Sequence, residues 1–294
     1  MLRAYGAPIT VPIENVITLD DNEISRVESF AREAQLDQFE HRILFECTAQ
    51  SGQSFINTDI AQDVAAELYK LLPSATVIFT THLPMTLKDP RSRYAGTLSL
   101  RETAHLTQHC TLFVGAGSGG TVAASSTSSR HLPMIQLLKK STSVYASFAC
   151  DFEYFGITDW PIIEMTDEDP ARIAKCISVT CRQGIAAASD EFDRRVAVTF
   201  DHYCKSIDLF LLRQHRYLDA ARSLMITANR FGWTQDLINF GKSRITPNLR
   251  LDPSWLFKSN RTTRDELLNA VEIASAQPVT VPHQKLWRDE NNKR

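Results

Sequence analysis

A glycine-rich stretch between two apolar runs constrains this sequence more than any other feature. Residues 111–138 read TLFVGAGSGGTVAASSTSSRHLPMIQLL. The first apolar run leads directly into a turn with four glycines in six residues, and the second apolar run follows Pro133. This order predicts a strand, a tight turn, a helix rich in small residues and a second strand.

Glycines in such a turn let backbone N–H groups approach an anion closely, and the start of the following helix favours phosphate through its dipole. The turn therefore predicts a phosphate-bearing ligand. The alternative is a structural turn whose glycines only let the helix pack close to the sheet, and a lone glycine-rich turn does not decide between them. The residues concerned are Gly115, Gly117, Ser118, Gly119, Gly120 and Thr121.

Apolar segments that resemble buried strands alternate with amphipathic segments along the first two thirds of the chain. Helices are expected up to about Ala34 after the capping residues at 20–23, from a cap at Thr58 or Asp59, and from Ser99, which has Glu102 at the capping-box spacing. Such alternation predicts a Rossmann-like parallel sheet with helices on both faces. The expected strands are 42–47, 75–80, 112–114, 134–138 and 161–164.

The remainder of the chain keeps a mainly helical period and shows no strand-like alternation. Helices are expected at 217–229, 233–240 and 264–274. The sequence therefore predicts an irregular lead-in at 1–14, an α/β domain at 15–189 and an all-α C-terminal region at 190–294.

Composition excludes several function classes. The net charge is −2, from 32 basic and 34 acidic residues, whereas a general nucleic-acid binder normally has a basic excess. No apolar run approaches the ~18 residues of a transmembrane helix, and residues 1–16 lack the apolar core of a signal peptide. The six scattered cysteines lack a zinc-site pattern and are interpreted as buried free thiols. These features favour a cytoplasmic protein without a bound metal.

Polar loops follow three of the expected strands, at 48–54, 81–84 and 115–121. Ligands of parallel α/β sheets bind at the carboxyl ends of strands, near the point where strand order reverses. If the three loops converge, they form one cleft. Glu46, at the end of the first strand, is interpreted as a carboxylate that is hydrogen-bonded within the fold, and a general base is the alternative. His82 is a ligand contact or a solvent-facing loop histidine.

The order of features from about residue 15 to residue 181 resembles the C-terminal, donor-binding half of a GT-B glycosyltransferase. It is most similar to the heptosyltransferase-like group, the ADP-heptose:lipopolysaccharide transferases. Residues 99–104 and 110–115 resemble the helix and strand before the donor loop of that family. Residues 118–124 resemble its Ser-Gly-x-x-His-x-Ala loop, and residues 132–135 resemble the strand that closes the unit.

The resemblance implies a nucleotide diphosphate sugar as donor substrate, transferred without a metal or other cofactor to a glycan or another acceptor, in polysaccharide biosynthesis. It places the diphosphate at the glycine-rich loop, with the Ser118 and Thr121 hydroxyls as donors. It brings Ser51 and Ser54 from the first loop, and Thr81 and His82 to the base or ribose. No catalytic residue is assigned. The resemblance also allows a peripheral location at the inner face of the membrane.

This sequence departs from the family pattern in ways that affect the expected activity. Val122 stands about where the family has a histidine, and the loop at 48–54 lacks a basic residue for the donor phosphates. A second α/β domain, which holds the acceptor in GT-B enzymes, is not visible. A partner chain or a missing N-terminal domain would have to supply the acceptor site.

Two other functions are kept as alternatives. The first is a non-catalytic glycosyltransferase-like module for binding or assembly. The second is an S-adenosylmethionine-dependent methyltransferase, because residues 113–119 resemble the glycine-rich loop of that family. Such a loop normally follows the first strand, with an acidic residue ending the next one, whereas here two strands precede it and the next strand ends in Leu138-Lys139-Lys140. A dinucleotide-dependent reductase meets the same difficulty.

Overall fold

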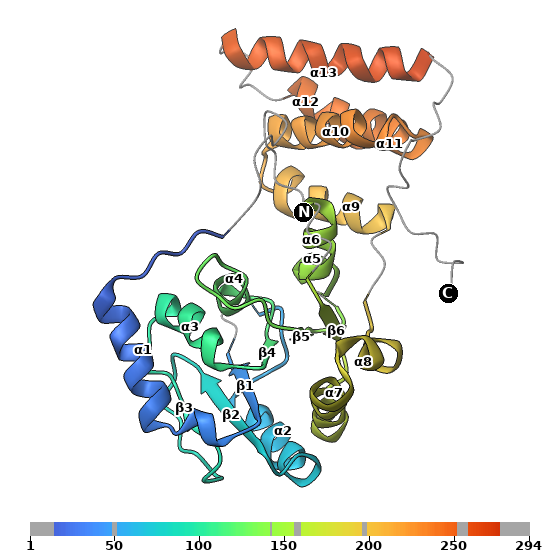
Figure 1. Ribbon diagram of the computed structural model, residues 1–294. Coiled ribbons are helices and arrows are strands. Elements are labelled where there is room, and N and C mark those ends of the chain that lie inside the picture. Colours follow the sequence, from blue (N-terminus) through green and yellow to red (C-terminus); the bar gives the residue numbers. More distant parts are fainter. Residues whose placement is uncertain are drawn as a thin grey trace. The chain divides into compact units, whose positions relative to one another are not determined.

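The computed structural model describes residues 15–48, 52–141, 143–155, 160–195, 199–251 and 258–276. These residues form two compact units, an α/β unit (described residues 15–195) and a helical unit (described residues 199–276). Figure 1 shows the sheet in the first unit and helices alone in the second. The predicted α/β fold with helices at the C-terminus is confirmed.

A six-stranded parallel sheet forms the centre of the α/β unit. Its spatial order is β3-β2-β1-β4-β5-β6, so the chain moves outward from β1 to β3 and then continues on the other side of β1. Strand order therefore reverses between β1 and β4. The strands are β1 (His41–Glu46), β2 (Ala75–Thr80), β3 (Arg93–Tyr94), β4 (Leu112–Gly115), β5 (Met134–Leu137) and β6 (Ile162–Met165).

Both faces of this sheet are buried under helices, as the apolar character of the strands predicts. Phe45 belongs to one core cluster, which α2 (Thr58–Leu71), α7 (Pro170–Gln183) and α8 (Ile185–Phe192) cover. Its neighbour Leu44 belongs to the opposite cluster, which includes residues of α1 (Asp21–Glu33) and α3 (Leu100–Leu106). The shorter helices of this unit are η1 (Leu36–Gln38), η2 (Thr107–His109), α4 (Gly119–Ala124), α5 (Ser143–Ala146) and α6 (Phe148–Phe155).

Side-chain caps mark the starts of several helices. Capping boxes begin α1 at Asp20 and α3 at Ser99, where the side chain binds a backbone amide three residues later. The predicted cap of α2 at Thr58 or Asp59 is wrong. Asn57 caps this helix instead, because its Oδ1 accepts hydrogen bonds from the amides of Asp59 and Ile60, each at 3.0 Å.

The boundary between the units lies near residue 196 rather than at 189. Helix α8 accounts for the difference, because Ala188 and Phe192 are buried in the core of the α/β unit. The sequence analysis also missed β3, which is only two residues long, and the helices α5 and α6 in the aromatic segment after β5.

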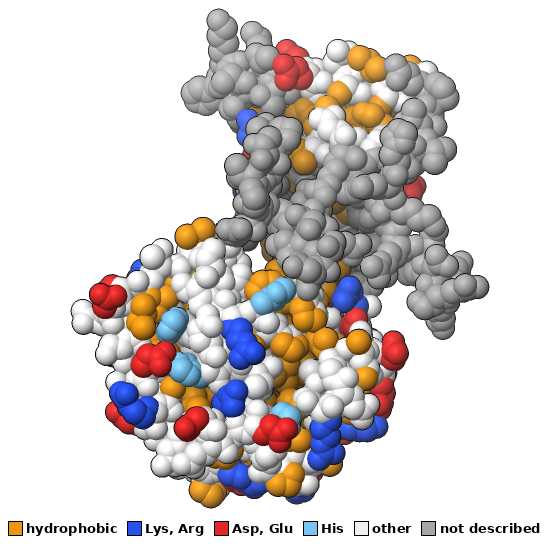
Figure 2. Space-filling view, in the orientation of Figure 1, with side chains coloured by type: hydrophobic (Ala, Val, Ile, Leu, Met, Phe, Trp, Pro, Cys, Tyr) orange, Lys and Arg blue, Asp and Glu red, His pale blue; other side chains and the backbone are white. Residues whose placement is uncertain are grey.

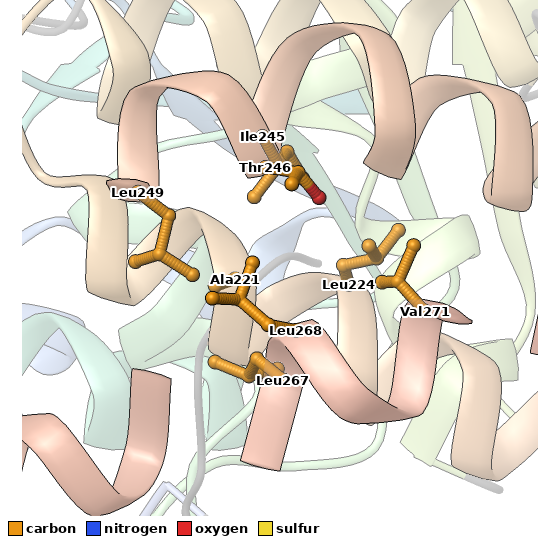
Figure 3. Close-up of a pocket in the computed structure, with 8 residues that line it drawn as sticks. All are labelled: Ala221, Leu224, Ile245, Thr246, Leu249, Leu267, Leu268 and Val271. Carbon is orange, nitrogen blue, oxygen red and sulfur yellow. The ribbon is translucent and has the colours of Figure 1, made fainter. Parts of the chain in front are cut away.

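The helical unit has its own apolar core, formed by side chains from successive helices. Figure 3 shows a cavity in this core, between α10, α13 and the segment at 245–249. Its volume of about 10 Å³ is at the lower limit for a single water molecule, so it is a packing gap and not a ligand site. The elements are α9 (Phe200–Ile207), α10 (Tyr217–Phe231), α11 (Gln235–Phe240), α12 (Thr246–Leu251), α13 (Lys258–Ala276) and two π-helical turns, η3 (Asp208–Leu212) and η4 (Gly241–Ile245).

Among the helices that the structure describes, none combines the length and the apolar composition needed to cross a membrane.

Candidate functional site

The candidate site lies where β1 and β4 end side by side. Strand order reverses between these two strands, and such a reversal is where open α/β sheets bind ligands. Glu46 is the last residue of β1, and Gly115 is the last residue of β4. The glycine-rich loop (residues 115–121) comprises the last residue of β4, the turn after it and the first residues of α4.

The Glu46 carboxylate is the principal hydrogen-bond acceptor within this loop. Its Oε1 accepts the Gly120 amide at 3.0 Å and also the Ser118 hydroxyl, while its Oε2 accepts the Ala116 amide at 2.9 Å. Thr121 Oγ1 lies 3.4 Å from the same Oε2. Only 6% of Glu46 is exposed. The interpretation of Glu46 as a carboxylate hydrogen-bonded within the fold is therefore confirmed.

Gln136 holds the loop from the other side. It lies on β5, opposite Gly115 in the register of the sheet. Its Oε1 accepts hydrogen bonds from the Gly117 amide at 2.9 Å and from Thr121 Oγ1 at 3.1 Å. Gly117 has φ +65°, a left-handed conformation that glycine adopts without the strain of a Cβ atom.

Three amides of the loop already have acceptors within the protein, and for two of them the acceptor is the Glu46 carboxylate. The amides at Ala116 and Gly120 are occupied by Glu46, and the amide at Gly117 is occupied by Gln136. The glycines also leave room for these side chains, because a Cβ atom built on Gly120 would lie 2.4 Å from Glu46 Oε1. The expectation that the diphosphate binds at Gly117 and Gly120 requires correction, because the amides of both residues already have acceptors.

Gly119 differs from Gly117 and Gly120 because it is exposed and has free space around it. The residue is exposed, and a Cβ atom built on it would meet only Leu100 Cδ2, at 3.8 Å. The outer side of the loop is therefore open at this position.

The first two polar loops meet at the ends of β1 and β2. Thr48 Oγ1 lies 2.9 Å from Thr81 Oγ1 and 3.3 Å from His82 Nδ1. Thr81 Oγ1 also accepts the Leu83 amide at 3.0 Å. These contacts bring the predicted residues Thr81 and His82 next to the end of β1, and His82 remains exposed.

Ser54 does not have the predicted role of facing a ligand. It is 7% exposed, its hydroxyl donates to the Leu137 carbonyl at the end of β5, and its Oγ accepts the Ile56 amide at 3.2 Å. Ser54 therefore ties the first loop to β5. Ser51, predicted in the same loop, lies outside the described residues.

The turn between β5 and α5 adjoins the first loop (48–54) and the glycine-rich loop. The Lys139 amide donates to the Gln53 carbonyl at 2.9 Å. A Cβ atom built on Gly117 would lie 2.7 Å from Leu138 Cδ2 and 3.3 Å from the Ala146 carbonyl. Loops after β1, β4 and β5 therefore converge at one edge of the sheet.

A second buried carboxylate lies further along the same edge. Glu164 on β6 pairs with Gln136 in the sheet register, and only 2% of it is exposed. It accepts the Ala149 amide at 3.0 Å and the Ser147 hydroxyl at 2.9 Å, at the start of α6. Burial raises the pKa of Glu164, and these two hydrogen bonds oppose that rise.

The other chemistry-bearing side chains near the site have structural surroundings. Burial raises the pKa of the Cys47 thiol far above its ordinary value, so this cysteine after β1 is not a nucleophile at neutral pH. Within the described parts of the chain, no three His, Cys, Asp or Glu side chains gather closely enough to hold a metal ion. Figure 2 shows acidic and basic side chains interspersed over one face of the α/β unit.

The sequence analysis considered Glu46 but missed Gln136 and Glu164. A common signal marks all three, because each is a single polar residue near the carboxyl end of an apolar run, in RILFEC, MIQLL and IIEM. A polar side chain that is buried at the end of a strand needs a hydrogen-bond partner, and the loops that follow the strands provide it.

No protein-family model matches this sequence, and no curated protein matches it either.

Proposed function

We propose that the α/β unit binds a nucleotide diphosphate sugar and acts as the donor-binding half of a GT-B-type glycosyltransferase. One observation carries the proposal: the glycine-rich loop meets the end of β1 at the point where strand order reverses, and Thr48 after β1 contacts Thr81 after β2. The resemblance in the sequence, at 99–104, 110–124 and 132–135, adds the class of ligand.

The donor would lie across the carboxyl ends of β1 and β4. Exposed Gly119 allows a ligand to approach the backbone closely on the outer side of the loop. His82, held near Thr48, is a candidate contact for the base or ribose. The chemistry would need no metal, because the charge that develops on the leaving diphosphate would be stabilised by fixed donors and cations.

The acceptor is a glycan or another hydroxyl-bearing molecule, and its site would be supplied by a partner chain or by a further domain. In this proposal the protein acts in polysaccharide biosynthesis, in the cytoplasm or at the inner face of the membrane. No described side chain is assigned as the catalytic base.

One observation favours a second candidate, a non-catalytic glycosyltransferase-like module. Glu46 already occupies two amides of the loop that would otherwise receive the diphosphate. A protein that retains the fold only for binding or assembly would need no free anion cradle.

A thermal-shift panel with UDP, GDP, ADP, CMP and S-adenosylmethionine tests the proposal, because a ligand that binds only the folded state raises the melting temperature. We expect one nucleoside diphosphate to raise it. Gly119→Leu should abolish the shift without loss of stability, because space is open at this position. A shift with S-adenosylmethionine alone would favour the methyltransferase, and no shift with any compound would contradict the donor site.

An assay of sugar-nucleotide hydrolysis separates the two remaining candidates. The full chain would be incubated with the matching UDP-, GDP- or ADP-sugar, and released nucleotide would be measured. Slow hydrolysis that Gly119→Leu removes would support a transferase. Binding without any hydrolysis, also after addition of candidate glycan acceptors, would support the non-catalytic module.

A further inference from the structure

The charge at the glycine-rich loop is unfavourable for a phosphate. The Glu46 carboxylate lies directly beneath the loop and accepts the amides of Ala116 and Gly120. A phosphate placed there would find these donors occupied and would face a like charge across a short distance. Both effects disfavour a second anion at this position.

The turn between β5 and α5, whose Leu138 lies beside Gly117, carries the opposite charge. Its sequence, Lys139-Lys140-Ser141, brings two cations to the carboxyl end of β5. Lys140 is exposed, and its carbonyl accepts the Ser143 hydroxyl at 3.2 Å, which fixes the turn. The turn contacts the first loop through the Lys139 amide and the Gln53 carbonyl, at 2.9 Å.

Two cations that follow other strands form ion pairs elsewhere. Arg101, in the first turn of α3, pairs with Glu23 at 2.6 Å, and Lys88, after β2, pairs with Asp63 at 3.7 Å. Among the described residues, no carboxylate forms an ion pair with Lys140. Its ammonium group is therefore a cation that an incoming anion can use without breaking an ion pair in the described structure.

We propose that the diphosphate group of the ligand binds at the β5–α5 turn, with the Lys140 ammonium as its charge partner. The glycine-rich loop, held by Glu46 and Gln136, then lines the site. The charge of the phosphates is neutralised by the turn and not by the loop. This assignment rests on the proposed function for the identity of the ligand. Lys140 would supply the positive charge that the loop at 48–54 lacks.

Titration calorimetry on the full chain with pyrophosphate tests the assignment directly, and the matched pairs UDP and uridine, GDP and guanosine, and ADP and adenosine extend it. Lys140→Gln should weaken pyrophosphate and nucleoside diphosphate binding by about tenfold or more, the loss expected for one hydrogen bond between charged groups. Binding of the nucleoside itself should not change. Lys140→Arg should restore most of the affinity, because it keeps the charge.

Lys70→Gln is the matched control, because Lys70 is an exposed lysine in the last turn of α2, which precedes β2 and lies at the opposite edge of the sheet. This variant should bind pyrophosphate and the nucleoside diphosphates as the wild type does. Equal pyrophosphate binding by Lys140→Gln and the wild type, or no pyrophosphate binding by the wild type, would overturn the assignment. If pyrophosphate binding depends on Lys140 but no nucleotide binds, the assignment of the turn stands and the proposed function fails.

Discussion

The Glu46 carboxylate accepts hydrogen bonds from two backbone amides and one hydroxyl of the glycine-rich loop, and a second hydroxyl lies within 3.4 Å, while 94% of the residue is shielded from solvent. Buried charge is tolerated in a protein only when such donors surround it. The carboxylate and the loop therefore depend on each other. The loop donors stabilise the buried charge, and the carboxylate provides the acceptor that the loop amides need.

Glu46→Ala should destabilise the α/β unit by about 2–4 kcal/mol, because the buried amides of Ala116 and Gly120 lose their acceptor. Urea unfolding measures the loss, and hydrogen exchange at these two amides should accelerate. Glu28→Ala is the control, because Glu28 is half exposed and pairs with His109 on the surface, so its removal should cost at most about 1 kcal/mol. Equal losses of unfolding free energy in the two variants would contradict the role of Glu46 as a buried acceptor that holds the loop.

Glu164 should make stability depend on pH. Its pKa is raised in the folded state, so its contribution to stability is fully present below the ordinary value of 4.5 and is lost as pH rises through the raised value. Glu164→Gln removes this titration and keeps a carbonyl acceptor for the Ala149 amide. The unfolding free energy of the variant minus that of the wild type should therefore increase above pH 4.5 and then level off.

Urea unfolding of both proteins between about pH 4 and pH 8 measures this difference. All other ionisable groups are shared, so the difference isolates Glu164. A difference that stays constant across the range would show that Glu164 titrates normally in the folded protein.

At the scale of elements, α4 is shaped by what lies beneath its first turn. A Cβ atom on Gly120 would lie 2.4 Å from Glu46 Oε1, whereas one on its neighbour Gly119 would meet only Leu100 at 3.8 Å. The two adjacent glycines therefore have different roles, although the sequence presents them alike.

Gly120→Ala should destabilise the protein by about 1–3 kcal/mol, the usual range for overpacking a buried position. Gly119→Ala should change stability by less than about 0.5 kcal/mol or increase it slightly, because alanine restricts the unfolded chain more than glycine does. The pair is compared by urea unfolding under identical conditions. Similar losses at both positions would show that backbone flexibility, and not the space beneath the loop, requires the glycines.

Most elements of the α/β unit were predictable from local sequence. The strand ATVIFT coincides with β2, and the Ser99–Glu102 capping box begins α3. Elements that depend on distant contacts were missed. The edge strand β3 has two residues and exists only through its pairing with β2, and α6 begins where the distant carboxylate of Glu164 binds the amide of Ala149.

The candidate site was predictable in position but not in occupancy. The sequence predicted polar loops after three parallel strands, and the structure brings Thr81 and the glycine-rich loop to the end of β1. Which acceptor fills the loop amides depends on the pairing of β1 with β4, because that pairing brings Glu46 beside Ala116 although 70 residues separate them. No local pattern encodes a contact of this kind.

At the scale of the whole molecule, the two units have separate cores: one cluster on each face of the sheet in the α/β unit, and a third cluster in the helical unit. Phe113 is fully buried between the sheet and the helices of the α/β unit, and Leu224 is buried within the helical unit. No cluster of buried apolar residues among the described ones draws on both units. Each core therefore contributes hydrophobic stabilisation to the unit that contains it.

Core substitutions should consequently act on one unit at a time. Phe113→Ala and Leu224→Ala each create a cavity, with an expected loss of about 2–5 kcal/mol in the unit that contains it. Hydrogen exchange followed by mass spectrometry should show faster exchange in β2 but not in α10 for Phe113→Ala, and the reverse for Leu224→Ala. The nucleotide-induced thermal shift should survive Leu224→Ala, because the candidate site lies in the α/β unit. If either substitution accelerated exchange equally in β2 and in α10, the two units would unfold as one. Ligand binding in the α/β unit would then depend on the stability of the helical unit as well.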